Sequence, residues 1–381
     1  MPIYRLLSFS FYPGEIAVQR VRIEGNKREE MNAFENIFGQ LKDIFAKSLI
    51  ESAAPLGSLG VDIGSHSVKM VRLEASKEGY KVLGFAVEKV SDKNYRDALS
   101  KALIKANAPL DLGAVISVAG QGVVSRYIEL PLMSKTELES SMKFEIEKYV
   151  PFSLVEVSSD YAVVRDIKDK AKMSVLVAAA KNDLIQKKCN FAKEINLNLK
   201  AIDLDCLALA NFFTEISGLP KKGTCLGIIN IGKSVSNINI LVDGVPCLSR
   251  DIFIGGDDIT RKMVESLEID YNEAEKMKLE PGSKKDELLS IWDSALNNLA
   301  AEIRVSLDYF EARNNKAVET MFITGGTSRL SGIEDYLNQL LSVEIKRFDY
   351  CSQLKYESAV SQDEFAKNSD LLAVALGLAL R

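Results

Sequence analysis

Two short glycine-containing turns carry the polar side chains best suited to chemistry in this sequence. The first turn and its flanks contain Asp62, Gly64, Ser65, Ser67 and Lys69. A glycine turn lets backbone amides approach an anion closely, and nearby hydroxyl groups can add hydrogen bonds. Asp62 could orient a hydrated Mg²⁺, and Lys69 could reach back to a phosphate oxygen. This pattern indicates a phosphate site, but a single turn of this kind is common in sheets.

The same arrangement recurs later in the chain. Residues 226–244 repeat the order of residues 59–74: an apolar run, a glycine with small polar neighbours, and a second alternating run. Each copy predicts a β-hairpin. Residues 114–120 and 321–326 follow the two hairpins as a second pair of similar strands. We therefore expect two duplicated α/β lobes that face each other across a cleft.

The second turn also matches the phosphate-loop pattern G-x-x-x-x-G-K-[ST], from Gly227 to Lys233 and Ser234. That motif requires a loop followed by a helix. Here the residues between the glycines favour extended structure, and residues 235–241 alternate with a period of two. The segment is therefore predicted to be strand, turn and strand. Gly232, Lys233 and Ser234 become candidates for a second phosphate-binding turn.

A third glycine segment lies near the end of the second repeat. Its candidate residues are Gly325, Gly326, Thr327 and Ser328. Two facing hairpins and such a loop together favour a nucleotide cleft, because each can bring backbone amides close to a phosphorylated ligand.

Composition narrows the classes of function. The chain has 48 basic and 53 acidic residues, a formal net charge of −5. Proteins that hold the nucleic-acid backbone are usually basic, so nucleic acid is not an expected partner. The single histidine, His66, lies inside the first turn, which excludes a two-histidine metal site. We expect the backbone amide of His66 to face a phosphate while its side chain points away.

Cysteine spacing and apolar runs indicate the compartment. The five cysteines are widely spaced and form no C-x-x-C pair, which is typical of buried, reduced thiols in the cytosol. The longest uncharged apolar run, Leu371–Leu380, is far below the ~20 residues that a membrane helix needs. Met1–Tyr12 lacks the order of a signal peptide. We expect a cytoplasmic protein that reaches a membrane only through a partner.

Between the turns, hydrophobic patterns alternate between strands and helices. Ser134 and Glu137 form a capping box, so a helix begins there and ends at Tyr149, before Pro151. The longest helical pattern carries Trp292. Strands are expected over 80–90, 157–166 and 173–180, and helices over 95–107, 135–149, 182–194, 205–214, 258–267, 272–278 and 285–313.

Four stretches carry a resemblance to a known family. They read GVDIGSHSVKMVRL from Gly60, IELPLMSKTELESSMKFEIEKYVPF from Ile128, FITGGTSRLSGIEDYLNQLL from Phe322, and LLAVALGLALR from Leu371. The turns and the third glycine segment resemble the two phosphate hairpins and the adenosine motif of the actin-like ATPase superfamily. Within it, the chain is similar to the type IV pilus assembly PilM family, a relative of the cell-division protein FtsA.

The resemblance implies an α/β fold of the actin-like ATPase type, with two duplicated α/β lobes around a nucleotide cleft. It also implies a strand-helix-strand-strand insert of the SHS2 type in lobe one. The expected parts are an N-terminal extension with an amphipathic helix at 1–58, lobe one at 59–213 with the insert at 123–201, and lobe two at 214–381.

The resemblance further implies ATP and Mg²⁺ between the lobes, with Asp62 holding the metal through water. Glu302 and its neighbour Arg304 would contact the base or ribose from the long helix. Asn230 stands where the superfamily usually has an aspartate, so we expect slow or absent hydrolysis. The expected nucleotide contacts are Asp62, Gly64, Ser65, His66, Ser67, Lys69, Gly232, Lys233, Ser234, Gly255, Gly256, Glu302, Gly325, Gly326, Thr327 and Ser328.

The implied role is a scaffold of type IV pilus assembly, peripheral at the inner membrane through its partners. It would bind the N-terminal tail of a PilN-like inner-membrane protein and contact other platform proteins. In the capped helix, Leu138, Met142 and Ile146 share one face, whereas Phe144 falls elsewhere. We expect Phe144 to be an exposed anchor for the partner's tail.

Two alternative functions remain open. An FtsA-like division protein would carry an amphipathic helix beyond a flexible linker, whereas Leu371–Leu380 is typical of a final core helix. A sugar kinase of the same superfold would need a general base and polar sugar ligands, and no distinctive signature for them is present. Separately, Met31 opens an amphipathic pattern, and we expect translation to begin there.

Overall fold

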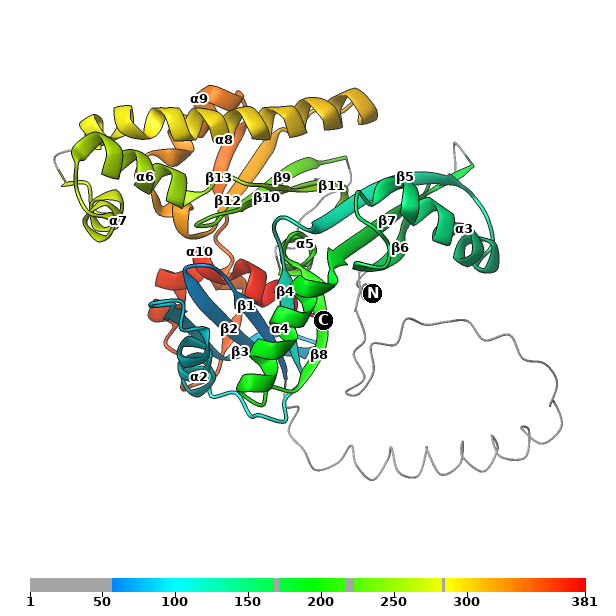
Figure 1. The fold of residues 1–381 in the computed structure, drawn as a ribbon, viewed down its shortest axis with the longest axis horizontal. Helices are drawn as coiled ribbons and strands as arrows, with labels where there is room; N and C mark the ends of the chain where they lie inside the picture. The colour runs from blue at the N-terminus through cyan, green and yellow to red at the C-terminus, as the bar shows by residue number, and fades with distance from the viewer. Residues whose placement is uncertain (1–56, 168–170, 217–222, 283–284) are drawn as a thin grey trace.

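The computed structural model describes residues 57–167, 171–216, 223–282 and 285–381. Two α/β lobes lie one above the other in Figure 1, and a small sheet with one helix extends to the side. The expectations for residues 1–56, including the amphipathic helix and a start at Met31, lie outside the described residues. The duplicated α/β architecture predicted from the repeats is confirmed.

Lobe one is built on a six-stranded sheet with the order β14-β3-β2-β1-β4-β8. The β1–β2 and β2–β3 pairs are antiparallel, and β1, β4 and β8 run parallel. Helices α2 and α4 cover one face of this sheet, and α5 and α10 cover the other. The strands are β1 (Ser58–Ile63), β2 (Ser67–Ser76), β3 (Gly79–Lys89), β4 (Ala114–Val118), β8 (Leu199–Leu204) and β14 (Lys355–Tyr356). The helices are α2 (Tyr95–Lys105), α4 (Asn182–Glu194), α5 (Asp205–Ile216) and α10 (Gln362–Ala379).

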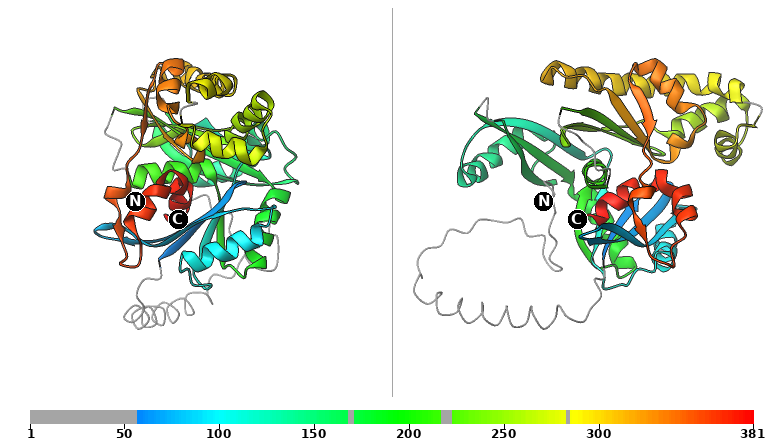
Figure 2. Two further views of the ribbon diagram at one scale, coloured as in Figure 1. Left: turned by 90° about the vertical axis from the view of Figure 1, so that its left-hand side faces the viewer. Right: turned by 180° about the vertical axis from the view of Figure 1, so that it is seen from behind.

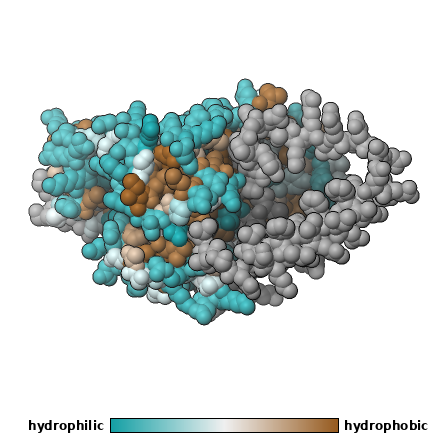
Figure 3. Space-filling model, turned by 90° about the horizontal axis from the view of Figure 1, so that it is seen from below, coloured by the Kyte–Doolittle hydropathy of each residue, from teal (hydrophilic) through white to brown (hydrophobic). Residues whose placement is uncertain are grey.

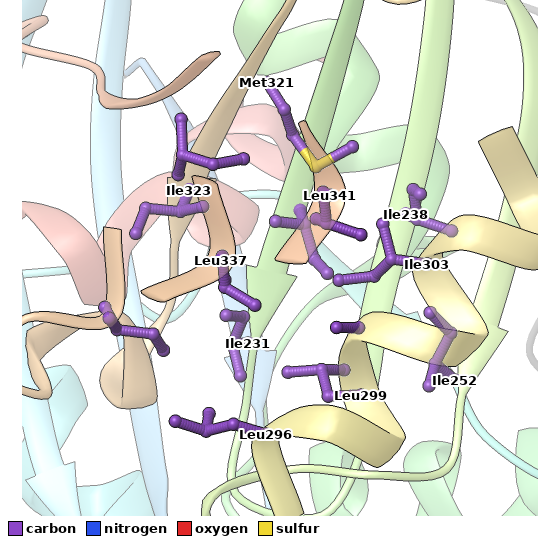
Figure 4. Close-up of a cluster of buried hydrophobic side chains, with 14 of the residues drawn as sticks. Ile231, Ile238, Ile252, Leu296, Leu299, Ile303, Met321, Ile323, Leu337 and Leu341 are labelled. Carbon is purple, nitrogen blue, oxygen red and sulfur yellow. The ribbon is translucent and has the colours of Figure 1, made fainter. Parts of the chain in front are cut away.

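Lobe two repeats this plan with a five-stranded sheet of order β11-β10-β9-β12-β13. The long helix α8 (Lys285–Asn314) lies over it, and Figure 4 shows Leu296, Leu299 and Ile303 of α8 directed at the strands. Trp292 is also fully buried there, as the helical spacing predicted. The other elements are β9 (Cys225–Ile231), β10 (Ser236–Val242), β11 (Val245–Ile252), α6 (Gly256–Leu267), α7 (Tyr271–Leu279), β12 (Thr320–Thr324), η3 (Gly326–Arg329), α9 (Ile333–Leu341), β13 (Glu344–Arg347) and η4 (Cys351–Gln353).

Residues 227–234, which match the pattern G-x-x-x-x-G-K-[ST], belong to a hairpin between β9 and β10 and not to a phosphate loop. Residues 225–231 pair antiparallel with residues 236–242, so strand, turn and strand replace the loop and helix that the sequence motif requires. The prediction made from the period of two is confirmed.

The insert has the predicted strand-helix-strand-strand order. It consists of β5 (Val123–Pro131), α3 (Lys135–Tyr149), β6 (Val157–Ile167) and β7 (Lys172–Lys181), with the sheet order β5-β7-β6. Ser134 and Glu137 form the predicted capping box at the start of α3. Figure 2 shows the insert extending away from both lobes.

Two predicted boundaries need correction. The insert ends near Lys181 and not at 201, because β8 joins the lobe-one sheet beside β4 and α4 lies against that sheet. Residues 355–379 belong with lobe one and not with lobe two, because β14 pairs with β3 and α10 lies against β1 and β2. Gly377 permits this docking, since a Cβ there would overlap the carbonyl oxygen of Ala208 on α5.

The final helix is a core element, as the apolar run predicted. Residues 372–379 of α10 are all buried. No helix within the described ranges is long and apolar enough to cross a membrane. In the part of the surface that Figure 3 colours, apolar side chains gather in the middle and hydrophilic side chains surround them. All five cysteines are free. Cys189, Cys206 and Cys225 are buried, as expected, whereas Cys247 and Cys351 are only partly buried.

Candidate nucleotide site

A cavity of about 350 Å³ lies where the two hairpin turns meet, and residues of both lobes line it. The turns have the same geometry. The amide of Gly64 donates to the carbonyl oxygen of Ser67, and the amide of Gly232 donates to that of Val235, each at 3.1 Å. Across the lobe boundary, the hydroxyl oxygens of Ser65 and Ser234 are 3.1 Å apart. The repeat seen in the sequence therefore places two matched turns face to face.

Close approach explains the glycines of both turns. A Cβ at Gly64 would lie 2.8 Å from Nζ of Lys69, and one at Gly232 would lie 2.6 Å from the carbonyl oxygen of Val235. Gly325 has a φ of +93°, which disfavours other residues, and a Cβ there would crowd Asn230 and Ile231. Side chains at these positions would deform the turns or fill the cavity.

The second turn is braced from behind by α6 and η3. Its Gly232 carbonyl oxygen accepts from the amide of Gly256 at 2.9 Å and from Oγ1 of Thr327 at 2.9 Å. The amide of Asp257 donates to the carbonyl oxygen of Lys233 at 2.8 Å. These bonds hold the turn in one orientation, which a site for a phosphate needs because its amides must already point at the anion.

Two acids and two lysines form one end of the cavity. Nζ of Lys69 is 3.0 Å from Oδ2 of Asp62, and Nζ of Lys188 donates to the carbonyl oxygen of Ile63 at 2.9 Å. Burial, followed by the negative charge of Asp62, raises the pKa of Asp205 to about 7. Burial lowers the pKa of Lys188. This end of the cavity therefore combines two lysine side chains, which could attract a polyphosphate, with the Asp205 carboxyl group, whose pKa is raised.

The far end of the cavity is formed by α7. Nζ of Lys278 is buried and donates to the carbonyl oxygen of Gly256 at 3.1 Å, to Oγ1 of Thr260 at 2.6 Å and to Oε1 of Glu275 at 2.5 Å. Glu275 and Lys278 both line the cavity. All three N–H groups of Lys278 are therefore used within the protein, and Glu275 is the acidic side chain that this helix contributes to the cavity wall.

Most of the predicted site residues meet at this cavity. They are Asp62, Gly64, Ser65, His66, Ser67, Lys69, Gly232, Lys233, Ser234, Gly256, Gly325, Gly326 and Thr327. Ser328 is buried beside it, and its hydroxyl donates to the carbonyl oxygen of Gly325 at 2.7 Å. Gly255 lies behind the second turn, where a Cβ would be 2.5 Å from the carbonyl oxygen of Lys233. Both residues shape the wall without lining it.

The two contacts expected from the long helix are wrong. Glu302 lies 2.5 Å from Nη2 of Arg250 in a separate cavity, and Arg304 donates to the carbonyl oxygen of Leu340. Helix α8 covers the back of the lobe-two sheet, whereas the shorter α7 reaches the cleft. The expectation for Glu302 and Arg304 came from the resemblance to the actin-like ATPase superfamily and not from the helical pattern itself.

Several lining residues were missed by sequence reasoning, among them the charged side chains of Asp205, Lys188, Glu275 and Lys278. Asp205 offered a signal, since it directly follows the buried strand β8, and polar residues at strand ends often line sites in α/β folds. Lys188, Glu275 and Lys278 lie on ordinary amphipathic helices and offered none.

Metal binding here would need the ligand's own oxygens. No group of three or more acidic, histidine or cysteine side chains among the described residues is arranged to hold a metal. Asp62 and Asp205 supply carboxylates at the cation-rich end. Mg²⁺ usually keeps several waters and is held by one or two carboxylates plus phosphate oxygens, so this donor set fits Mg²⁺ carried by a polyphosphate.

Two lobes with matched hairpins, and a cavity between them, define the actin-like ATPase fold. A sequence profile of the type IV pilus assembly protein PilM family matches residues 60–381, and the chain belongs to this family. The structure of a PilM–PilN type IV pilus biogenesis complex aligns with a TM-score of 0.75 and 21% identity over 85% of this chain and 98% of that one.

The ethanolamine utilization protein EutJ from Carboxydothermus hydrogenoformans is also similar in fold. It aligns with a TM-score of 0.51 and 14% identity, over 86% of this chain and 90% of that chain. This similarity is one of fold, and it is shared with a protein that is not named as a pilus protein.

Proposed function

We propose that the cavity binds ATP with Mg²⁺ and that the protein is a nucleotide-binding scaffold of type IV pilus assembly. The observation that carries this is the meeting of two matched glycine turns at Ser65 and Ser234. Each turn offers amides and a hydroxyl group from a different lobe. A polyphosphate between them would contact both lobes and favour their closed arrangement.

The charged residues of the site would have two different roles in binding the nucleotide. Lys69 and Lys188 would neutralise phosphate charge, and Asp62 with Asp205 would orient a hydrated Mg²⁺. When bound, the metal would screen the phosphate oxygens. Asn230 offers no carboxylate, and its Nδ2 is already donating to Oδ1 of Asn237 at 2.9 Å. We therefore expect ATP to bind with micromolar affinity and to be hydrolysed slowly or not at all.

Partner binding is the second part of the proposal. The expected partner is the cytoplasmic N-terminal tail of a PilN-like membrane protein, and other platform proteins would join through the assembled complex. Membership of the PilM family and the similarity to a PilM–PilN complex support this partner. Phe144 is 69% exposed on α3, although the neighbouring Leu138, Met142 and Ile146 are buried. An exposed aromatic side chain suits a peptide anchor.

Calorimetry with Mg·ATP tests the nucleotide site. Replacing Gly64 with valine should abolish binding, because its Cβ would displace the Lys69 ammonium group and its methyl groups would enter the cavity. Gly282→Asn is the matched control, since Gly282 has a φ of +54° with open space around its Cβ position, a conformation that asparagine tolerates. Full affinity in Gly64→Val would reject this site.

A further inference from the structure

A series of hydrogen bonds leaves the second phosphate turn and crosses into lobe one. Nδ2 of Asn230 donates to Oδ1 of Asn237 at 2.9 Å, and Nδ2 of Asn237 donates to Oδ1 of Asp251 at 2.7 Å. The other carboxylate oxygen of Asp251 accepts from the amide of Gly120 at 2.8 Å. Asn230 and Asn237 line the cavity, and Gly120 follows β4 of lobe one. The series therefore joins the cavity wall to the opposite lobe.

Gly120 is the point at which the insert leaves lobe one. Its carbonyl oxygen accepts from the amide of Val123, the first residue of β5, at 3.0 Å. Its φ is +98°, a conformation that favours glycine and sets the direction of the turn into the insert. Asp251 thus holds the backbone at the base of the insert.

Two residues earlier on β11, Ser249 contacts the insert itself. Its carbonyl oxygen accepts from Oγ of Ser125 at 3.1 Å, and its own hydroxyl oxygen is 3.0 Å from that of Tyr127. The Ser249 hydroxyl also donates to Oδ1 of Asn239 at 2.5 Å. Ser125, Asn239 and Ser249 are buried, so water does not compete for these bonds. Positions 249 and 251 share one side of the strand because side chains alternate along it.

We propose that Ser249 and Asp251 form a latch on β11, through which nucleotide in the cleft sets the position of the insert. The inference rests on the proposed nucleotide function and adds its regulation. Opening the lobes would draw β11 away from Gly120 and β5, leaving the Gly120 amide and the buried Ser125 hydroxyl without their partners on β11. Asn237 and Asp251 would stay paired, because they lie opposite each other on β10 and β11 of lobe two. A ligand that favours closure therefore also fixes the insert, so the two movements are coupled.

Hydrogen exchange of the β5 amides, with and without Mg·ATP, measures this coupling. In the wild-type protein, Mg·ATP should slow exchange over residues 123–130 by about fivefold or more. In Asp251→Asn, an NH₂ group replaces one of the two oxygens that accept from the Gly120 amide and from Nδ2 of Asn237, so one of these bonds is lost. The slowing of exchange by Mg·ATP should then fall below about twofold. Because Asp251 does not line the cavity, calorimetry should find its Mg·ATP affinity within about threefold of the wild type.

A matched control separates loss of the latch from general loss of stability. Tyr350→Phe removes a buried hydroxyl group that donates to the carbonyl oxygen of Ser369 on α10 at 2.7 Å, away from β11 and the insert. That variant should keep the full slowing of β5. Ser249→Ala is a smaller change to the same latch and serves if Asp251→Asn does not fold; it should lose at least half of the slowing.

The possible outcomes separate a failure of the latch proposal from a failure of the proposed nucleotide site. If Asp251→Asn or Ser249→Ala keeps the full ATP-dependent slowing, the latch is wrong. If the wild type binds Mg·ATP in the calorimeter without slowing of β5, the latch is wrong and the nucleotide site stands. If the wild type shows no binding heat, the proposed nucleotide function fails, and the latch fails with it.

Discussion

The hydroxyl oxygens of Ser65 and Ser234 lie 3.1 Å apart, although the two residues belong to different lobes. Both side chains are exposed at the cavity, so a phosphate group can replace this direct hydrogen bond with bonds to both hydroxyl groups. The lobes thus already meet at the point where a ligand would join them. A nucleotide would need little further movement of the turns to contact both.

Replacing Asn230 with aspartate tests why hydrolysis is expected to be slow. The carboxylate could orient a hydrated metal, so phosphate release from Mg·ATP should increase. The same change removes the donor to Oδ1 of Asn237 and sets two acceptors against each other, which should lower the unfolding free energy by about 1–2 kcal/mol. Asn230→Ser is the control, since it lacks a carboxylate. An unchanged rate of phosphate release would mean that the missing carboxylate at position 230 is not what limits hydrolysis.

The pH dependence of stability tests the environment of Asp205. Burial and the charge of Asp62 raise its pKa to about 7, so the fold favours the protonated acid. This stabilisation is fully present below the unfolded pKa of about 4 and is lost as the pH rises through about 7. Asp205→Asn, which stays neutral, should therefore be more stable than the wild type at about pH 8, with the difference vanishing near pH 4.

Urea denaturation at several pH values measures this difference. Asp111→Asn, which changes an exposed acid of lobe one, is the control. An Asp205→Asn variant that is less stable than the wild type at alkaline pH would mean that the Asp205 carboxylate stabilises the ligand-free protein.

Removing the buried ammonium group of α7 should destabilise lobe two. Lys278 is 6% exposed and donates to Gly256, Thr260 and Glu275. Lys278→Met would leave these acceptors and the Glu275 carboxylate without their cation, at a cost of about 2–3 kcal/mol. Lys276→Met, an exposed lysine of the same helix, is the control. Chemical denaturation compares the two, and equal stability would contradict the role given to Lys278.

Shortening Phe144 tests the partner surface. Phe144→Ala should weaken binding of the PilN-like N-terminal peptide by about 30-fold, because burying the ring contributes about 2 kcal/mol. Fluorescence anisotropy with a labelled peptide measures the dissociation constant, and Mg·ATP affinity should not change. Ile104→Ala removes a 79% exposed side chain on α2 and is the control. An unchanged dissociation constant for Phe144→Ala would remove Phe144 from the interface.

Elements with local signals could be predicted from the sequence. The turns at Gly64 and Gly232 were identified because a strand alternates with a period of two and a tight turn needs glycine. The start of α3 was identified from Ser134 and Glu137, which satisfy the first amides of the helix through neighbouring atoms. Repetition of the hairpin also determined the two-lobed plan, since similar sequence segments adopt similar folds.

Which distant side chains share the cavity could not be predicted from the sequence, because it depends on how the helices pack against the sheets. Lys278 reaches it because α7 lies across the cleft, whereas Glu302 does not because α8 covers the back of the sheet. Both helices have an apolar face and a charged face, so periodicity cannot tell which charged face meets a cavity. The return of α10 to lobe one has the same cause, since its apolar second half could fit either core. The close fits of Gly377 against Ala208 and of Gly60 against Ala375 select lobe one.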